Sequence, residues 1–131
     1  MDSKYTYKNL NAYIEAKNLV KQVYALLEKF PKTENYALCD QLRRAVISVP
    51  SNIAEGSGRF SAKEQVHFLE ISYGSLMEVS AQLDIAYDLN YINQTELTSL
   101  EHQVDVVASL LSGLRSKRLS LTHSSTHPLT E

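Results

Sequence analysis

The sequence predicts an all-α fold in which four helices form an antiparallel up-down-up-down bundle. Apolar residues recur at alternating intervals of three and four residues in four separate segments, which is the spacing of one helix face. Short polar connections containing proline, glycine or asparagine separate these segments, and connections this short join antiparallel neighbours. No segment has the strict alternation of apolar and polar residues that a half-buried strand requires.

The size and charge of the chain limit the class of protein it can be. Its 131 residues are enough for one domain, and 44% hydrophobic with 21% charged residues is typical of a soluble globular protein. The net charge of −2 gives no general attraction to nucleic acid or membranes. The first residues lack the apolar core of a signal peptide, and no stretch reaches the roughly 20 apolar residues of a membrane span. We therefore expect a cytoplasmic protein with no membrane partner.

We expect residues 1–9 to be a flexible arm, residues 10–117 to form the bundle, and residues 118–131 to be a disordered tail. The first helix should end at Phe30-Pro31, because proline disfavours helical geometry in the residue before it. Residues 1–32 carry six lysines against three carboxylates, and we expect the lysines to form a solvated face. One apolar stripe runs along this helix: Ala12, Ala16, Leu19, Val23, Leu26 and Phe30.

The second helix should begin near Thr33 or Asn35, either of which can act as its N-cap. Its apolar stripe is Leu38, Leu42, Ala45, Val49 and Ile53. Pro50 lies inside this helix, where a proline removes one backbone donor and costs about 3 kcal/mol in an unadapted helix. We expect a kink near residues 46–50, with the freed backbone groups bonded by the short polar side chains of Ser48, Ser51 and Asn52.

The glycine-rich stretch at residues 56–58 should end the second helix, because glycine takes the left-handed C-terminal position without a steric penalty. Ser61 and Glu64 then form a capping box at the start of the third helix. This third helix has a full heptad seam: Ala62, Val66, Leu69, Tyr73, Leu76, Ser80, Leu83 and Tyr87.

A second seam lies beside the first on the third helix: Phe68, Ser72, Ser75, Val79, Gln82, Ala86 and Leu89. A helix with two such faces offers more apolar surface than a lone bundle requires, so we expect the second seam to be an oligomer interface. Asn93 and Glu96 repeat the capping pattern before the fourth helix, whose stripe is Leu97, Leu100, Val104, Val107, Leu111 and Leu114.

The residues that could support catalysis do not form a recognisable site. Glu64 and His67 make an E-x-x-H pattern of the kind that di-iron bundles use, but those bundles need a second such pair and two more glutamates. The remaining histidines lie on a polar face or in the tail, which gives no arrangement for nucleophilic catalysis. Cys39, the single cysteine, has Asp40 beside it, which raises the pKa of a thiol. We expect no enzyme activity, no metal and no cofactor.

Arg43 and Arg44 flank the buried stripe of the second helix, and two interpretations remain open for them. One is an ion pair with a carboxylate, on the same subunit or across subunits: Glu55, Glu70 or Glu78. The other is contact with the phosphates of RNA or DNA. The candidate nucleic-acid-binding residues are then Arg43, Arg44, Arg59, Arg115, Lys117 and Arg118.

Residues 30–92 strongly resemble the four-helix bundle proteins encoded within intervening sequences of bacterial 23S ribosomal RNA genes, and a looser likeness extends over residues 8–118. The residues that match the family pattern are Gln41, Arg43, Arg44, Ala45, Ser48, Pro50, Asn52, Ile53, Ala54, Glu55, Gly56, Gly58, Phe68, Leu69, Gly74, Ser75 and Glu78. The resemblance implies an antiparallel bundle that assembles into a ring-like homopentamer. It implies no particular reaction.

A related branch resembles the accessory protein of diversity-generating retroelements, a pentamer that binds nucleic acid and a reverse transcriptase through a basic surface. This chain differs in charge, because a pentamer of chains with net charge −2 would carry about −10. Our leading hypothesis is a non-enzymatic homo-oligomer whose partner is ribosomal RNA or a ribonucleoprotein. The alternative is a protein-interaction scaffold with no nucleic-acid binding. Candidate interface or structural residues are Arg43, Arg44, Asn52, Glu55, Gly56, Gly58, Ser72, Ser75 and Glu78.

Overall fold

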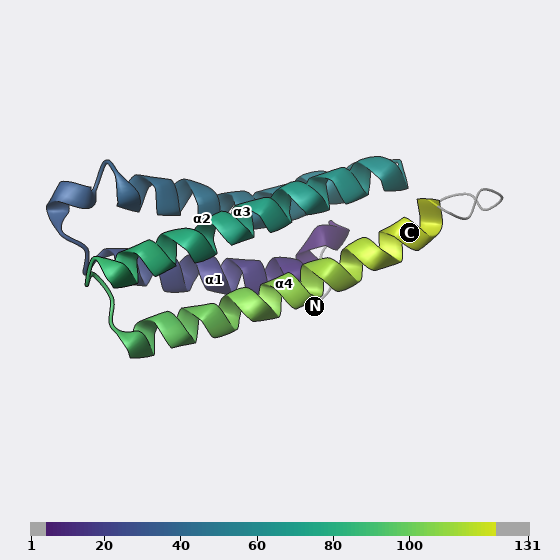
Figure 1. Cartoon of the computed structure of the whole chain (residues 1–131). Helices are drawn as coiled ribbons and strands as arrows, with labels where there is room; N and C mark the ends of the chain where they lie inside the picture. Colours follow the sequence, from purple (N-terminus) through teal and green to yellow (C-terminus); the bar gives the residue numbers. More distant parts are fainter. Residues whose placement is uncertain (1–4, 123–131) are drawn as a thin grey trace.

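The computed structural model of the chain describes residues 5–122, and four α-helices make up most of this part (Figure 1). They are α1 (Asn11–Leu27), α2 (Leu38–Ser57), α3 (Ala62–Asp88) and α4 (Gln94–Thr122). Each helix contacts the next along the chain, and α1 also contacts α4. Residues 5–122 contain no strand. The predicted all-α fold with four helices is therefore confirmed.

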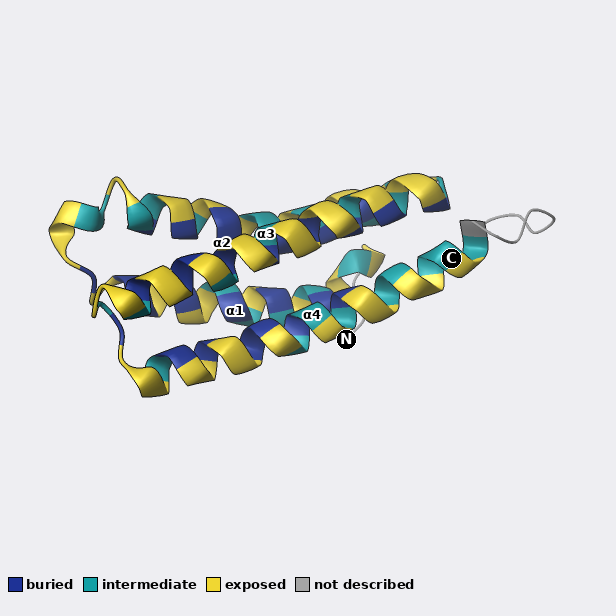
Figure 2. Cartoon of the chain, in the orientation of Figure 1, coloured by how far each residue is buried: buried dark blue, intermediate teal, exposed yellow. Residues whose placement is uncertain are grey.

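The core lies between the four helices, and each helix turns its buried face toward the others (Figure 2). All six residues of the predicted α1 stripe are buried, as are four of the five predicted for α2, where Leu38 is partly exposed. The predicted stripes are buried because removing apolar surface from water is the main favourable contribution to folding. A helix with an apolar stripe gains that contribution only when a neighbouring helix covers the stripe.

The connections gather at two ends of the molecule (Figure 1). At one end, the ring of Phe30, after α1, lies 5.3 Å from the ring of Tyr91, before α4. The hydroxyl of Tyr91 donates to a carboxylate oxygen of Glu34 over 2.7 Å. At the other end lies the short connection between α2 and α3. We call these the 28–37 end and the 58–61 end.

Helix α4 and the N-terminal segment differ from the predicted bounds. Helix α4 continues past residue 117 to Thr122, and a 3-10 helix covers Thr6–Asn9 in the segment expected to be a flexible arm. The apolar spacing fails after Arg115, but the residues up to Thr122 include neither proline nor glycine, so nothing in them stops the helix. The predictions for residues 1–4 and 123–131 lie outside the described residues.

We predicted that Thr33 or Asn35 would cap the start of α2, and neither residue does. Its N-cap position is Ala37, and the nearest side-chain acceptor is Glu34, whose carboxylate receives the Leu38 N–H over 3.4 Å. A 3-10 turn at Lys32–Glu34 delays the helix by several residues. Asn35 instead bonds a side chain of α2, as described below.

Helix α2 continues through Pro50 without interruption. Asn52 donates from its amide nitrogen to the carbonyl oxygen and to the hydroxyl of Ser48, over 2.9 Å in each case. Ser72 of α3 donates to the carbonyl of Val49 over 2.8 Å. Side chains therefore donate to the carbonyls of Ser48 and Val49, whereas the carbonyl that lacks its amide donor because of Pro50 is that of Val46, four residues earlier. The predicted bonding of that freed group by Ser48, Ser51 or Asn52 stays a prediction.

The glycine-rich stretch at residues 56–58 ends α2 as predicted, but not through a glycine in the left-handed conformation. Gly58, the C-cap residue, has φ −85°, and no glycine of residues 5–122 has a positive φ. Gly56 is instead a contact point, because a Cβ built there would lie 2.9 Å from the Cβ of Phe68. The missing side chain lets α2 and α3 approach each other closely. Within residues 5–122, Asn90, just beyond α3, is the one residue in the left-handed region, with φ 64°.

The second seam of α3 is mostly covered within the chain, so the predicted oligomer interface is wrong at its centre. Ser72 is fully buried, and Val79, Gln82 and Ala86 are buried as well. The hydroxyl of Ser75 lies 2.8 Å from that of Ser48, so this seam packs on α2. Sequence spacing shows that a face is apolar, but it does not show which neighbour covers the face.

The cap at the start of α4 is complete, whereas the one at the start of α3 is half formed. Glu96 N–H donates to the side-chain oxygen of Asn93 over 2.8 Å, and Asn93 N–H donates to the Glu96 carboxylate over 2.9 Å. This reciprocal pair is the predicted capping box. At α3 the hydroxyl of Ser61 accepts from Glu64 N–H over 3.1 Å, but the Glu64 carboxylate turns toward Arg59.

The cap of α4 gives a prediction about pH. The hydrogen bond from Lys29, followed by that from Asn93, lowers the pKa of the Glu96 carboxyl. A lowered pKa in the folded state adds stability that is present above the unfolded pKa, about 4.3, and is lost as pH falls through the folded value. Glu96→Gln keeps an oxygen for the cap but removes the charge. We expect the variant to lose less stability than the parent when denaturant unfolding is measured from about pH 6 down to pH 3.

Glu101→Gln is the matched control, because it removes the same charge from the exposed surface of the same helix. Its unfolding free energy should follow the parent through acid. A Glu96→Gln curve parallel to that of the parent would contradict the assignment.

Candidate functional site

The six cations that the sequence singled out do not form one patch. Arg43 and Arg44 lie in the first turns of α2, near the 28–37 end (Figure 1). Arg59 follows α2 at the 58–61 end, and the other three are in the last turns of α4: Arg115, Lys117 and Arg118. A single phosphate-binding surface that includes all six within one chain is therefore excluded.

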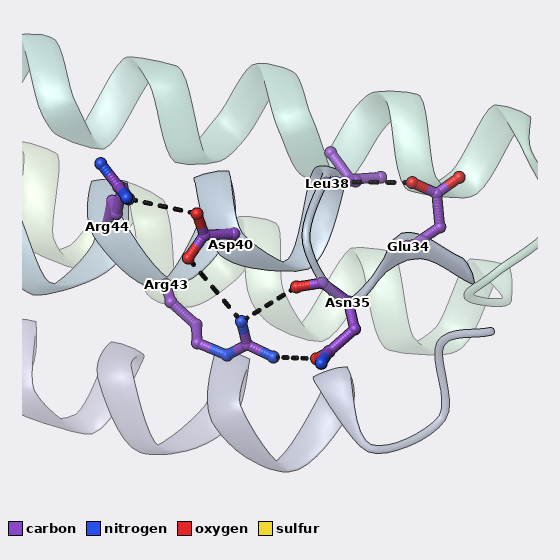
Figure 3. Close-up of polar contacts among 6 residues, drawn as sticks. All are labelled: Glu34, Asn35, Leu38, Asp40, Arg43 and Arg44. Atoms are coloured by element: carbon purple, nitrogen blue, oxygen red, sulfur yellow. Dashed lines mark hydrogen bonds and ion pairs between the residues drawn. The ribbon is translucent and has the colours of Figure 1, made fainter. Parts of the chain in front are cut away.

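Arg43 is held by the connection before its own helix (Figure 3). One terminal nitrogen donates to the side-chain oxygen of Asn35 over 2.6 Å, and the other donates to the backbone oxygen of the same residue over 3.3 Å. Asp40 lies 4.0 Å away on the next turn back. These bonds fix the connection on the start of α2, so the role of Arg43 in this chain is structural.

Arg44 pairs with the other oxygen of Asp40 over 3.3 Å, and its side chain is 81% exposed (Figure 3). An exposed pair at this spacing contributes a few tenths of a kcal/mol. Within the chain, the predicted partners of Arg43 and Arg44, namely Glu55, Glu70 and Glu78, are wrong, whereas a pair across subunits stays a prediction. Those carboxylates bond Arg59, Arg115 and Gln82.

Arg59 links the end of α2 to the start of α3. Its guanidinium lies 2.7 Å from the Glu55 carboxylate and 3.8 Å from that of Glu64, and it stacks 4.6 Å from the ring centre of Phe68. Its carbonyl accepts from the side-chain amide of Gln65 over 2.8 Å. These contacts hold the connection between two helices, which accounts for Glu55 and Arg59 structurally.

Arg115 ties α4 to α3 through two nitrogens, 2.6 and 2.7 Å from one carboxylate oxygen of Glu70. Lys117 is exposed and Arg118 is partly exposed, and within residues 5–122 no carboxylate pairs with either. Of the six candidates, Lys117 and Arg118 are therefore the two whose charge is most available to a binding partner, and both lie toward the 58–61 end.

The small and polar candidates serve the contact between α2 and α3. Ser72, Ser75 and Asn52 bond across or along these helices, and Gly56 lets them approach. Gly58 ends α2. Glu78 is exposed and accepts from Gln82 over 3.2 Å. Only Glu78 among the candidates on α3 remains open to a partner.

Residues 5–122 contain no cluster of histidine, cysteine, aspartate and glutamate that could hold a metal ion. His67 is exposed, with its ring 5.4 Å from that of Phe68, and Glu64 of the E-x-x-H pattern pairs with Arg59. Burial raises the pKa of the Cys39 thiol, against a smaller opposing effect of Arg43. The thiol is therefore protonated at neutral pH and is not an activated nucleophile.

A scan against family models adds the observation that decides the family. The model described as 23S rRNA-intervening sequence protein matches residues 8–113, which is most of the chain. This chain belongs to that family. A search of curated proteins finds no match to it.

The intervening-sequence protein has a groove of about 800 Å³ beside Arg43. It is lined by Tyr24, Phe30 and Asn35, and by Tyr36, which is 92% exposed.

No helix among the described residues is long and apolar enough to cross a membrane.

Sequence reasoning missed a third stripe on α3 of this intervening-sequence protein. Its residues, which we call the α3 outer face, are Ile71, Gly74, Glu78, Ala81 and Ile85. All five are exposed, at 38% for Ile71 and 48% for Ile85. Their spacing of three and four residues was the available signal, but two larger stripes on the same helix obscured it.

Proposed function

We propose that this protein is a non-enzymatic, homo-oligomeric helical scaffold. Its bundles are antiparallel and up-down-up-down, and they assemble into a ring-like homopentamer in the cytoplasm. Ribosomal RNA or a ribonucleoprotein is the partner we propose for the ring. The description of the family, which ties these proteins to an intervening sequence of 23S rRNA, makes that RNA the first to test.

The α3 outer face is the observation that carries this proposal. Ile71 and Ile85 lie 14 residues, almost four helical turns, apart on this face. Because the bundle of residues 5–122 leaves them exposed, they lose contact with water only if another chain covers them. Gly74 has no atom within 4 Å of a built Cβ, so a second backbone can approach it. Exposed apolar side chains that follow one helix face are typical of interaction surfaces.

Light scattering on the purified full chain tests the assembly. We expect a mass near five times the chain mass of 14.8 kDa at micromolar concentration. A single-chain mass at that concentration would overturn the proposal.

Binding to fragments of 23S rRNA at several salt concentrations tests the RNA partner. Each phosphate contact changes affinity by close to one log unit per decade of salt, so binding should weaken steeply as salt rises. Lys117 and Arg118 are the residues whose replacement by glutamine should reduce the slope. A chain that stays unbound at low salt would overturn this clause and leave the scaffold intact.

The second candidate function is a protein-interaction scaffold that binds no nucleic acid. One observation favours it: four of the six candidate cations already pair with carboxylates in the same chain. Such pairs must be broken or shared before phosphate can be bound. A complex with a protein partner that survives nuclease treatment would favour this function over the first.

A further inference from the structure

We propose that the α3 outer face of one copy docks into the groove between α1 and α2 of the next copy. The occupant is a second copy of this chain. The inference rests on the proposed self-assembly and adds which two surfaces meet. The contact is heterologous, since the two surfaces differ and belong to different helices.

The groove lies between α2 and α1, whereas α3 packs on α2 elsewhere. It has a volume of about 390 Å³ and is lined by apolar residues of both helices, among them Val20 of α1 and Ile47, Pro50 and Ala54 of α2. Ile47 is 42% exposed although it points into this groove. A groove between two helices, with an apolar floor, fits a third helix.

The rim of the groove is positive. Lys17 and Lys21 of α1 line it, and no lining residue is acidic. Lys17 lies 5.1 Å from the ring centre of Tyr13, and within residues 5–122 neither lysine pairs with a carboxylate. The lysines predicted to be a solvated face thus border an apolar surface.

The α3 outer face has the opposite character. Of the five carboxylates on α3, those of Glu64 and Glu70 pair with arginines, and Glu78 is the one that belongs to this face. Glu78 stands in the middle of the stripe, between Gly74 and Ala81, where small side chains let a neighbour come close. The two isoleucines lie 14 residues, about 21 Å, apart along α3, so one of them enters the groove while Lys17 or Lys21 of the next copy meets Glu78. Complementary charge around an apolar centre sets the register and direction of such a contact.

The charge pattern also argues against two α3 outer faces meeting each other. An isologous contact would bring the Glu78 carboxylates of the two copies near each other, and like charges at an interface are unfavourable. A heterologous contact between two copies leaves the groove free on one copy and the α3 outer face free on the other, so further copies can add. Such contacts close into a ring when the rotation between neighbours allows it.

Cysteine cross-linking in the full chain tests the pairing of surfaces. Gly74→Cys labels the α3 outer face and Ser51→Cys labels the groove, and both positions are exposed. Native Cys39 is 2% exposed, so it reacts little. We expect the double variant, treated with a short bismaleimide, to give a ladder of covalent multimers. Each single variant should stay monomeric on a denaturing gel.

Several outcomes would overturn the inference. Cross-linking of Gly74→Cys alone would indicate an isologous contact, and an assembled double variant without a ladder would mean that other surfaces meet. In both cases light scattering still gives a multiple of the chain mass, so the proposed function survives. The control pairs Gly113→Cys of α4 with Ser51→Cys, and this pair should give no ladder.

A matched pair of charge variants gives a second readout. Gly74 and Gly113 both have open space around a built Cβ, so Gly74→Lys and Gly113→Lys should both fold. Helical content by circular dichroism confirms folding. We expect at least a tenfold weaker assembly for Gly74→Lys, because the added charge would face the lysines of the groove, and no change for Gly113→Lys. Equal assembly of the two variants would contradict the docking of the α3 outer face.

Discussion

Gly56→Leu is expected to destabilise the fold by about 3 kcal/mol, although it replaces a glycine inside a helix by a strong helix former. A Cβ at this position would lie 2.9 Å from the Cβ of Phe68 and 3.3 Å from the backbone oxygen of Gln65. Neither atom is the end of a flexible side chain, so α2 and α3 must move apart. Helix propensity returns only about 1 kcal/mol. Denaturant unfolding followed by circular dichroism measures the difference.

Gly113→Leu is the control for this prediction. It makes the same substitution inside α4, where no atom lies within 4 Å of a built Cβ. The control should be neutral or more stable by up to about 1 kcal/mol. Similar free energies of unfolding for the two variants would show that α2 and α3 do not depend on close approach at Gly56.

The inner stripes could be predicted from the sequence because the signal for them is local. Ala16, Leu19 and Val23 follow one another at helical spacing, and burial of that stripe needs only some neighbour. The capping box of Asn93 and Glu96 is local in the same sense, since both partners lie within four residues.

The contacts of the arginines could not be predicted, because they depend on the path of a connection. Arg43 bonds Asn35 since the chain turns back through a 3-10 helix before α2 begins. The two residues are eight positions apart in the sequence, and no periodic pattern brings them together. The carboxylates we expected as partners were matched by charge alone, which does not determine distance.

Gly56 illustrates the same limit for packing. A glycine near the end of a helical pattern usually indicates a left-handed cap, and that was the prediction. Its actual reason, the nearness of Phe68, involves a residue on another helix. The second seam of α3 failed likewise, because an apolar face at Ser72 and Val79 is equally suited to a neighbour in the same chain or in another.

Leu76→Ala is expected to destabilise the fold by about 3 kcal/mol, within the range measured for buried leucines. Leu76 has no exposed surface and belongs to the α3 seam that faces the core. Truncation removes three carbons from contact and leaves a cavity that packed helices fill only in part. Since small domains unfold with about 5–15 kcal/mol, this loss is a large share of the total. Denaturant unfolding at fixed protein concentration measures it.

Leu89→Ala is the control, because it makes the same chemical change just after α3, at a side chain that is 48% exposed. We expect a cost below about 1 kcal/mol there. The comparison separates burial in the core from the loss of a leucine as such, since both variants lose the same atoms. If Leu89→Ala costs as much as Leu76→Ala, residue 89 must be covered in solution. In that case the apolar surface buried by assembly extends beyond the α3 outer face to the end of the helix.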